Sequence, residues 1–308
     1  MRRLSQFPAP YHDECYYSIL CRYFQRMGYS SFDRTMQGLF GKPHHAELFI
    51  LMPYLASCVN EWVDPASGIC AESITRRHTA FSYCVLADLS WYDPDDIREG
   101  MWNGTLRNHS GFRTVKKDTL CYCPACACDD RKKYGETYWH RIHQIRGITV
   151  CEKHGTVIKS SGISFKQTRH GFYPASAVTN MQEKAIVSSE KEWKRIEQLS
   201  ADIAWVMDNG QTIRKKRSVS KMMKQYLSVK GFELTGNGCL NNSEIGLKGF
   251  GDFHLEHKRG FFSHPAFQNI FQRQYVPLWT FDFFEPLDII MLAEYLEGTA
   301  EDFFELTL

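Results

Sequence analysis

The sequence predicts a mostly α protein in three parts: a helix-turn-helix-like N-terminal domain over residues 1–120, a zinc-finger module over 121–160 and a helical C-terminal domain over 161–308. Two observations predict this organisation. Apolar residues recur with the 3.6-residue period of helices, and 43% of all residues are hydrophobic, which is enough to form packed cores. In the middle of the chain, cysteine and histidine residues have the spacing of a tetrahedral zinc site.

The N-terminal part contains short helical patterns separated by turn residues. Gly28 follows the first pattern and Gly41 the second, and glycine is common directly after a helix. Ser30 or Ser31 is suited to cap the start of the second helix. The expected helices cover residues 14–27, 31–41, 46–62, 69–84 and 94–102. Short helices joined by short turns are typical of a helix-turn-helix-like bundle.

Two pairs of residues predict the zinc site. Cys123 and Cys126 form a C-x2-C knuckle, and Cys151 and His154 form a C-x2-H knuckle 24 residues further on. Thiolates and imidazoles suit zinc, and a two-residue gap lets one tight turn direct both side chains at one ion. Four protein ligands leave no position for a catalytic water, so we expect one structural Zn²⁺ ion.

Other cysteines and histidines near the knuckles are alternative ligands. Cys121 and Cys128 flank the first knuckle, but the two-residue spacing favours Cys123 and Cys126. His140 and His143 compete with His154, although we expect them to support the site or to pack beside it. A short helix is expected over 127–134, where Gly135 ends it.

The C-terminal part also shows helix boundaries. Ser189 and Glu192 have the spacing of a capping box, which opens a helix that we expect to stop at Asn209 and Gly210. A second helix-turn-helix candidate follows, with a helix over 218–229 and a shorter one from Ser243. The last expected helix covers 286–297.

Charge is distributed unevenly along the chain. The formal net charge is +2, but residues 281–308 hold eight acidic residues and no lysine or arginine, which leaves 37 basic and 27 acidic residues, a net +10, in the rest. A basic body with an acidic tail fits contact with nucleic acid. The candidate DNA-binding residues are Arg214, Lys215, Lys216, Arg217, Lys221 and Lys224, together with Arg131, Lys132 and Lys133 beside the first knuckle.

Several functional classes are disfavoured. The longest apolar stretch, 48–59, is too short for a bilayer span, and no export signal precedes it, so we expect a soluble protein. The chain contains no P-loop and no G-x-S-x-G motif, which disfavours an enzyme. His45 and Glu47 match half of a nucleobase deaminase motif, but the matching cysteine pair is too distant and in the wrong order.

Several segments together resemble the TniQ/TnsD family, the target-selection proteins of Tn-seven-like transposons, some of which are CRISPR-associated. The opening Pro-x-Pro-Tyr-x-x-Glu pattern, the His-Thr-x-Phe segment and the Tyr-Gly-Glu and Trp-His insert between the knuckles carry the likeness. The similar segments are 8–14 with Ser18 and Arg22, 77–81, 122–126, 134–141 and 151–155. A weaker likeness continues into 286–290.

The resemblance implies a non-enzymatic adaptor in the bacterial cytoplasm, associated with the nucleoid during transposition. Such proteins read a target and recruit a TnsC-type AAA+ ATPase, which brings the TnsA/TnsB transposase. The family's zinc ligands correspond to Cys123, Cys126, Cys151 and His154. Double-stranded DNA and the ATPase are therefore the expected partners, and a membrane is not.

Two departures from the family bear on the branch. No second cysteine-rich zinc ribbon, which some Cascade-bound TniQ proteins carry, follows His154. Longer TnsD members continue beyond the point where this chain stops, so we expect a short or truncated member. The second helix-turn-helix candidate and the long C-terminal half favour the DNA-reading TnsD branch. The alternative is a protein–protein bridge between a CRISPR effector and TnsC with little DNA affinity. A zinc-containing transcription regulator is a more distant alternative.

Overall fold

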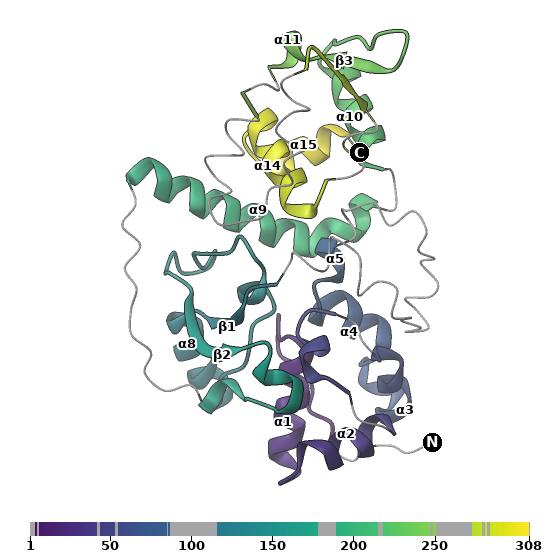
Figure 1. Cartoon of the computed structure of the whole chain (residues 1–308). Coiled ribbons are helices and arrows are strands. Elements are labelled where there is room, and N and C mark those ends of the chain that lie inside the picture. Colours follow the sequence, from purple (N-terminus) through teal and green to yellow (C-terminus); the bar gives the residue numbers. More distant parts are fainter. Residues whose placement is uncertain are drawn as a thin grey trace. The chain divides into compact units, whose positions relative to one another are not determined.

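The computed structural model describes residues 4, 6–41, 44–52, 55–84, 86, 116–177, 189–214, 218–246, 249–250, 273–278, 281 and 284–307. The described residues are mostly helical, as predicted, and contain two small antiparallel two-stranded sheets (Figure 1). They form two compact units, Met1–Ser82 with Trp91–Ser200 and Tyr83–Ser90 with Ala201–Leu308. The three-part division at 120 and 160 stays a prediction.

The first unit begins with helices α1 (Tyr16–Arg26) and α2 (Phe32–Phe40). The side chain of Ser31 accepts a hydrogen bond from the backbone N–H of Arg34, which caps α2 as predicted. Gly41 has φ 72° directly after α2, a conformation that a residue with a Cβ rarely adopts. Helix α1 buries Tyr16, Ile19 and Leu20 in the core of this unit.

Two of the predicted N-terminal helices are broken. Within 46–62, Leu55 has φ 53°, and the described residues form short 3-10 turns and α3 (Val59–Trp62). Within 69–84, Thr79 is extended and separates α4 (Ala71–His78) from α5 (Phe81–Cys84). Its hydroxyl accepts the N–H of Phe81, so a polar side chain ends one helix and supports the next. The helix predicted over 94–102 lies outside the described residues.

The segment with the two knuckles consists of β1 (Thr119–Tyr122), α8 (Pro124–Tyr134) and β2 (Lys159–Ser164). The two strands pair antiparallel, with Cys121 opposite Ser160. Cys123 caps α8, Pro124 occupies its first turn, and Gly135 ends it with φ 78°. The helix predicted over 127–134 is therefore real and starts one turn earlier.

Helix α9 (Glu190–Arg214) contributes to both units, because the division falls between Ser200 and Ala201. The side chain of Ser189 accepts the N–H of Glu192, as expected for the start of this helix. The predicted stop at Asn209 and Gly210 is wrong. The helix continues and buries Ile213, so tertiary packing overrides the low helix propensity of these two residues.

The second unit also contains α10 (Val219–Val229), β3 (Cys239–Asn241), α11 (Asn242–Ile245), β4 (Tyr275–Pro277), α14 (Pro286–Glu297) and α15 (Ala300–Thr307). Strands β3 and β4 pair antiparallel. Helix α15 packs against α10 and α14, and buries Phe303 against Tyr226 of α10 and Phe304 against Trp205 of α9. The sequence prediction missed α15.

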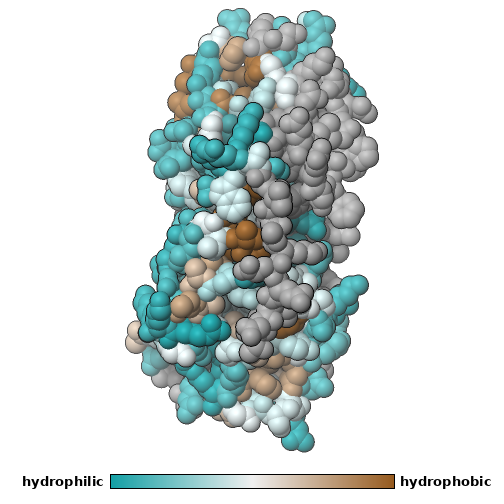
Figure 2. Space-filling view, turned by 90° about the vertical axis from the view of Figure 1, so that its left-hand side faces the viewer, coloured by the Kyte–Doolittle hydropathy of each residue, from teal (hydrophilic) through white to brown (hydrophobic). Residues whose placement is uncertain are grey.

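Most of the described surface on the face shown in Figure 2 is hydrophilic, with small hydrophobic patches between. Among the described residues, no helix combines the length and the apolar composition that crossing a bilayer requires.

Candidate metal centre

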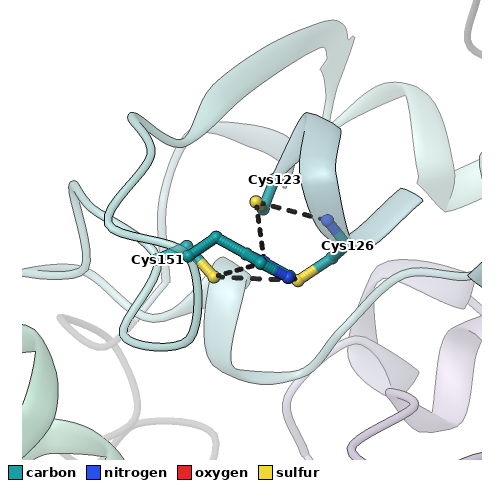
Figure 3. Close-up of side chains that lie close together, drawn as sticks. Cys123, Cys126 and Cys151 are labelled. Atoms are coloured by element: carbon teal, nitrogen blue, oxygen red, sulfur yellow. Dashed lines mark hydrogen bonds between the residues drawn. The ribbon is translucent and has the colours of Figure 1, made fainter. Parts of the chain in front are cut away.

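The predicted ligands Cys123, Cys126, Cys151 and His154 lie together, with one ligand atom from each inside a group no more than 4.8 Å across. Cys123 and Cys126 come from the start of α8, where the thiol of Cys123 accepts the N–H of Cys126. Cys151 and His154 come from a tight turn in which the Gly155 N–H bonds to the Cys151 carbonyl. The three cysteine side chains point toward one another (Figure 3).

The distances within the group match a tetrahedral zinc site. The Nδ1 atom of His154 is 3.6 Å from Cys123 Sγ, 3.3 Å from Cys126 Sγ and 3.6 Å from Cys151 Sγ. The sulfurs of Cys126 and Cys151 are 3.7 Å apart. Zinc bonds of about 2.3 Å to sulfur and about 2.0 Å to nitrogen give tetrahedron edges of about 3.8 Å and about 3.5 Å. The four residues therefore fit a closed zinc site.

Electrostatics also favour a cation at this position. The three cysteines are almost fully buried. Hydrogen bonds with Cys126 and Cys151 lower the pKa of Cys123, whereas the interactions with Cys123 raise the pKa of Cys126 and bring the pKa of Cys151 to about 11. Three thiolates in contact repel one another, so the group ionises fully only with a positive ion between the sulfurs.

A carboxylate that the sequence prediction did not include contacts the histidine of the group. Nε2 of His154 is 3.1 Å from Oδ2 of Asp129, which lies one turn after Cys126 in α8. Hydrogen bonding to His154 and to Lys153 lowers the pKa of Asp129. The three-residue step from Cys126 was the available signal, because residues three apart share a helix face.

The alternative ligands lie outside the four-residue group. The thiol of Cys121 bonds to the carbonyl of Thr119, and Cys128 is exposed. His140 bonds to Asp130 through Nε2 at 3.0 Å. His143 is buried with Nε2 3.9 Å from Cys126 Sγ, and burial holds its pKa well below the ordinary value. His143 therefore lies beside the group, and its supporting role stays a prediction.

A polar network connects the segment between the two knuckles to α1 and to the residues before it. We call this network the junction, and it consists of Tyr11, Asp13, Glu14, Arg22, Glu136 and Arg141. The guanidinium of Arg22 bonds to Glu14 at 2.7 Å and to Glu136 at 2.9 Å. It also lies 3.7 Å from the ring centre of Tyr11, whose hydroxyl donates to Glu136. One arginine thus links the chain start, α1 and the insert between the knuckles.

The second half of the junction is built around Asp13. Its carboxylate accepts hydrogen bonds from Arg141 Nε at 2.8 Å and from the Ile142 N–H at 3.1 Å. Asp13 has φ 53°, a strained conformation that Asp tolerates better than most residues. Arg141 also donates to the carbonyls of Arg76 and Thr79 beside α4. Segments around residues 13, 78 and 140 therefore meet at one place.

Two aromatic and polar contacts extend the junction into the core. The N–H of Trp139 donates to the hydroxyl of Ser18 on α1, and its indole donates to the Tyr173 carbonyl. Nδ1 of His78 is 2.6 Å from the carbonyl oxygen of Glu14. Three of the segments that carry the family resemblance, around residues 8–22, 77–81 and 134–141, thus contact one another.

The predicted DNA-binding residues belong to different units. Arg131, Lys132 and Lys133 are exposed on the last turn of α8, in the first unit. Lys221 and Lys224 are exposed on α10, in the second unit. Arg214 is the last residue of α9, while Lys215, Lys216 and Arg217 lie outside the described residues.

The described residues define a mostly helical protein that contains a group of four side chains able to hold a metal ion. The chain belongs to the TniQ family, whose sequence model matches residues 5–158, half of the chain. It is also similar to the transposon Tn7 transposition protein TnsD of Escherichia coli, with 24% identity over 161 residues. That alignment covers 50% of this chain and 31% of TnsD, so the chain spans less than a third of that relative.

Proposed function

We propose that the chain is a non-enzymatic target-selection adaptor for DNA transposition. It binds attachment-site DNA and recruits a TnsC-type AAA+ ATPase, which in turn brings the TnsA/TnsB transposase. The observation that carries the proposal is the family match over residues 5–158, which covers the ligand group and the junction. The similarity to a transposition protein supports it.

The proposed role of the metal is structural. One Zn²⁺ ion, bound by Cys123, Cys126, Cys151 and His154, neutralises the thiolates and holds the start of α8 against the turn at 151–155. Because α8 leads directly into Glu136 and Arg141, the position of its first turn sets the position of the junction. The ion supplies folding free energy and takes part in no reaction.

The proposed DNA contacts are the exposed cations. Lys221 and Lys224 are three residues apart and so share one face of α10. Arg131, Lys132 and Lys133 form a second group at the end of α8. The basic segment 214–217 is proposed to add to the first group. Lysine and arginine bind the DNA backbone by displacing its counterions, so affinity must fall with salt.

The test measures binding to a duplex that spans the insertion site of the parent transposon, with a scrambled duplex for comparison, as a function of KCl concentration. The double variant Lys221→Glu, Lys224→Glu is compared with Lys166→Glu, Lys191→Glu, which reverses two exposed lysines outside both groups. If both lysines of α10 contact phosphates, the first variant lowers the slope of log affinity against log salt by roughly two, about one per contact. The control keeps the slope of the wild type.

Equal affinities and slopes for the two variants would remove α10 from the proposed DNA surface. A wild-type chain that does not bind the duplex but retains the ATPase in a pull-down would favour the protein–protein bridge between a CRISPR effector and TnsC.

A further inference from the structure

Two adjacent carboxylates of α8, Asp129 and Asp130, bond to different histidines. Asp130 is buried and bonds to His140 at 3.0 Å and to the hydroxyl of Thr137 at 3.1 Å. Asp129 is 3.1 Å from Nε2 of His154. Successive helix residues point about 100° apart, so the two carboxylates serve different sides of α8. Asp130 bonds to the insert that contributes Glu136 and Arg141 to the junction, and Asp129 bonds to a proposed metal ligand.

The two nitrogens of His154 face different groups. Nδ1 lies 3.3–3.6 Å from the three sulfurs, whereas Nε2 faces the carboxylate of Asp129. A neutral imidazole carries one proton, and the nitrogen without that proton has the lone pair that binds a metal. A carboxylate that accepts the Nε2 proton therefore leaves Nδ1 free to bind the ion.

We infer that His154 binds the metal through Nδ1, and that Asp129 is the positioning residue that selects this nitrogen and fixes the orientation of the ring. The inference rests on the zinc site proposed above. Asp129 touches the ligand and not the ion, so its removal weakens binding without removing the site. Loss of such a supporting carboxylate typically lowers metal affinity 10–100-fold.

The surroundings of Asp129 provide matched controls. Lys153 Nζ is 3.4 Å from the same carboxylate oxygen, and both side chains are largely exposed. An exposed pair of this kind contributes little, so Lys153→Ala tests the ion pair alone. Glu152 is exposed and its Oε2 lies 3.8 Å from the thiol of Cys151, so Glu152→Gln removes a negative charge beside a different residue of the group and leaves the contact between Asp129 and His154 intact.

The first measurement is the zinc affinity of the full chain in competition with a chromophoric chelator. Asp129→Asn is expected to lower the affinity 10–100-fold, and Asp129→Glu, which keeps a carboxylate acceptor, to recover part of the loss. Lys153→Ala and Glu152→Gln are expected to change it by less than about fivefold. Circular dichroism at saturating zinc checks that all variants are folded.

The second measurement is a long-range ¹H–¹⁵N correlation spectrum of the histidine rings in the zinc-loaded chain. The expected spectrum has the His154 proton on Nε2 and the metal on Nδ1, with faster exchange of that proton with water in Asp129→Asn. A metal-bound Nε2, or an Asp129→Asn affinity equal to that of the two controls, would overturn the inference and leave the zinc site standing. A wild-type chain that binds no zinc would overturn the zinc site and the inference with it.

Discussion

The guanidinium of Arg22 lies 2.7 Å from the carboxylate of Glu14, and both side chains are almost completely buried, at 3% and 0% exposure. Burial raises the pKa of Glu14 to about 7, although Arg22 opposes this shift. The same guanidinium also contacts Glu136 from the insert between the knuckles. Arg22 therefore links Glu14, which lies just before α1, to the insert between the two knuckles.

Replacement of Arg22 is expected to destabilise the first unit strongly. Arg22→Met leaves Glu14 without its counter-charge, and removing one partner of a buried pair costs about 3–5 kcal/mol. Glu14→Gln should cost less, because the amide still accepts hydrogen bonds and the raised pKa shows that the carboxylate is already disfavoured. The free energy of unfolding of both variants is measured by urea denaturation, monitored by circular dichroism at saturating zinc.

Arg26 provides the control for this prediction. Its contact with Glu136 is 3.1 Å long, but its side chain is 44% exposed. Arg26→Ala is therefore expected to cost less than about 1 kcal/mol. An Arg22→Met variant as stable as Arg26→Ala would show that the buried pair does not hold the junction.

Stability should depend on pH through two groups with opposite effects. Burial lowers the pKa of His78 to about 4, so its contribution to stability rises as pH increases from about 4 to about 6.5, by roughly 3 kcal/mol. The raised pKa of Glu14 acts in the other direction: its contribution is complete below about 4.5 and is lost as pH rises through about 7. The two contributions nearly cancel in the wild type.

Single variants separate these contributions. His78→Gln should show stability that falls between pH 4.5 and 7 relative to the wild type, and Glu14→Gln should show a steeper rise. Protonation of the metal ligands is common to all three proteins, so the difference between the curves is the relevant quantity. Parallel curves for wild type and His78→Gln would contradict a buried neutral histidine.

The ligand assignment predicts a sharp contrast among cysteines. Cys123→Ser and His154→Ala are each expected to lose about one equivalent of zinc and to destabilise the first unit, since the free energy of metal binding is part of the folding free energy. Cys121→Ser and Cys128→Ser should keep the zinc, because neither thiol belongs to the ligand group. Elemental analysis after dialysis measures the zinc content of each variant. Full zinc occupancy in Cys123→Ser and His154→Ala would refute the ligand assignment.

In the second unit, the start of α15 depends on a residue distant in sequence. The carboxylate of Asp202 on α9 is buried and accepts the N–H of Ala300 at 3.0 Å. Asp202→Ala is expected to cost about 1–2 kcal/mol, the usual effect of losing a helix cap. Glu305→Ala, at an exposed position of α15, is the control and should be nearly neutral in thermal denaturation. Equal melting temperatures for the two variants would argue against this cap.

Local signals in the sequence predicted α1, α2, α10 and α14, because their apolar faces and the glycines that follow them are close together in the sequence. Non-local effects explain the errors. Buried Ile213 extends α9 past Gly210, and the positive φ of Leu55 divides a predicted helix. Helix α15 had a local signal that was overlooked, because Thr299 and Asp302 bond to each other across its first turn.

The candidate site, like the fold, was predicted where the signal is local in the sequence and missed where it is not. The two-residue gaps of the knuckles identified all four grouped side chains, because a tight turn brings such residues together. Asp129 was missed: its three-residue step from Cys126 places it on the same helix face, but its contact with His154 depends on how the turn at 151–155 folds against α8. The junction was also beyond reach from spacing alone, because residues such as Glu14 and Glu136 meet only after folding.

The most direct test of the adaptor function measures retention of the TnsC-type ATPase on immobilised insertion-site DNA, with and without this chain, at low ATPase concentration. The account predicts that the ATPase is retained only when the chain is present, and that Lys221→Glu, Lys224→Glu reduces retention while the control Lys166→Glu, Lys191→Glu does not. Retention that is the same with and without the chain would contradict a role in target selection.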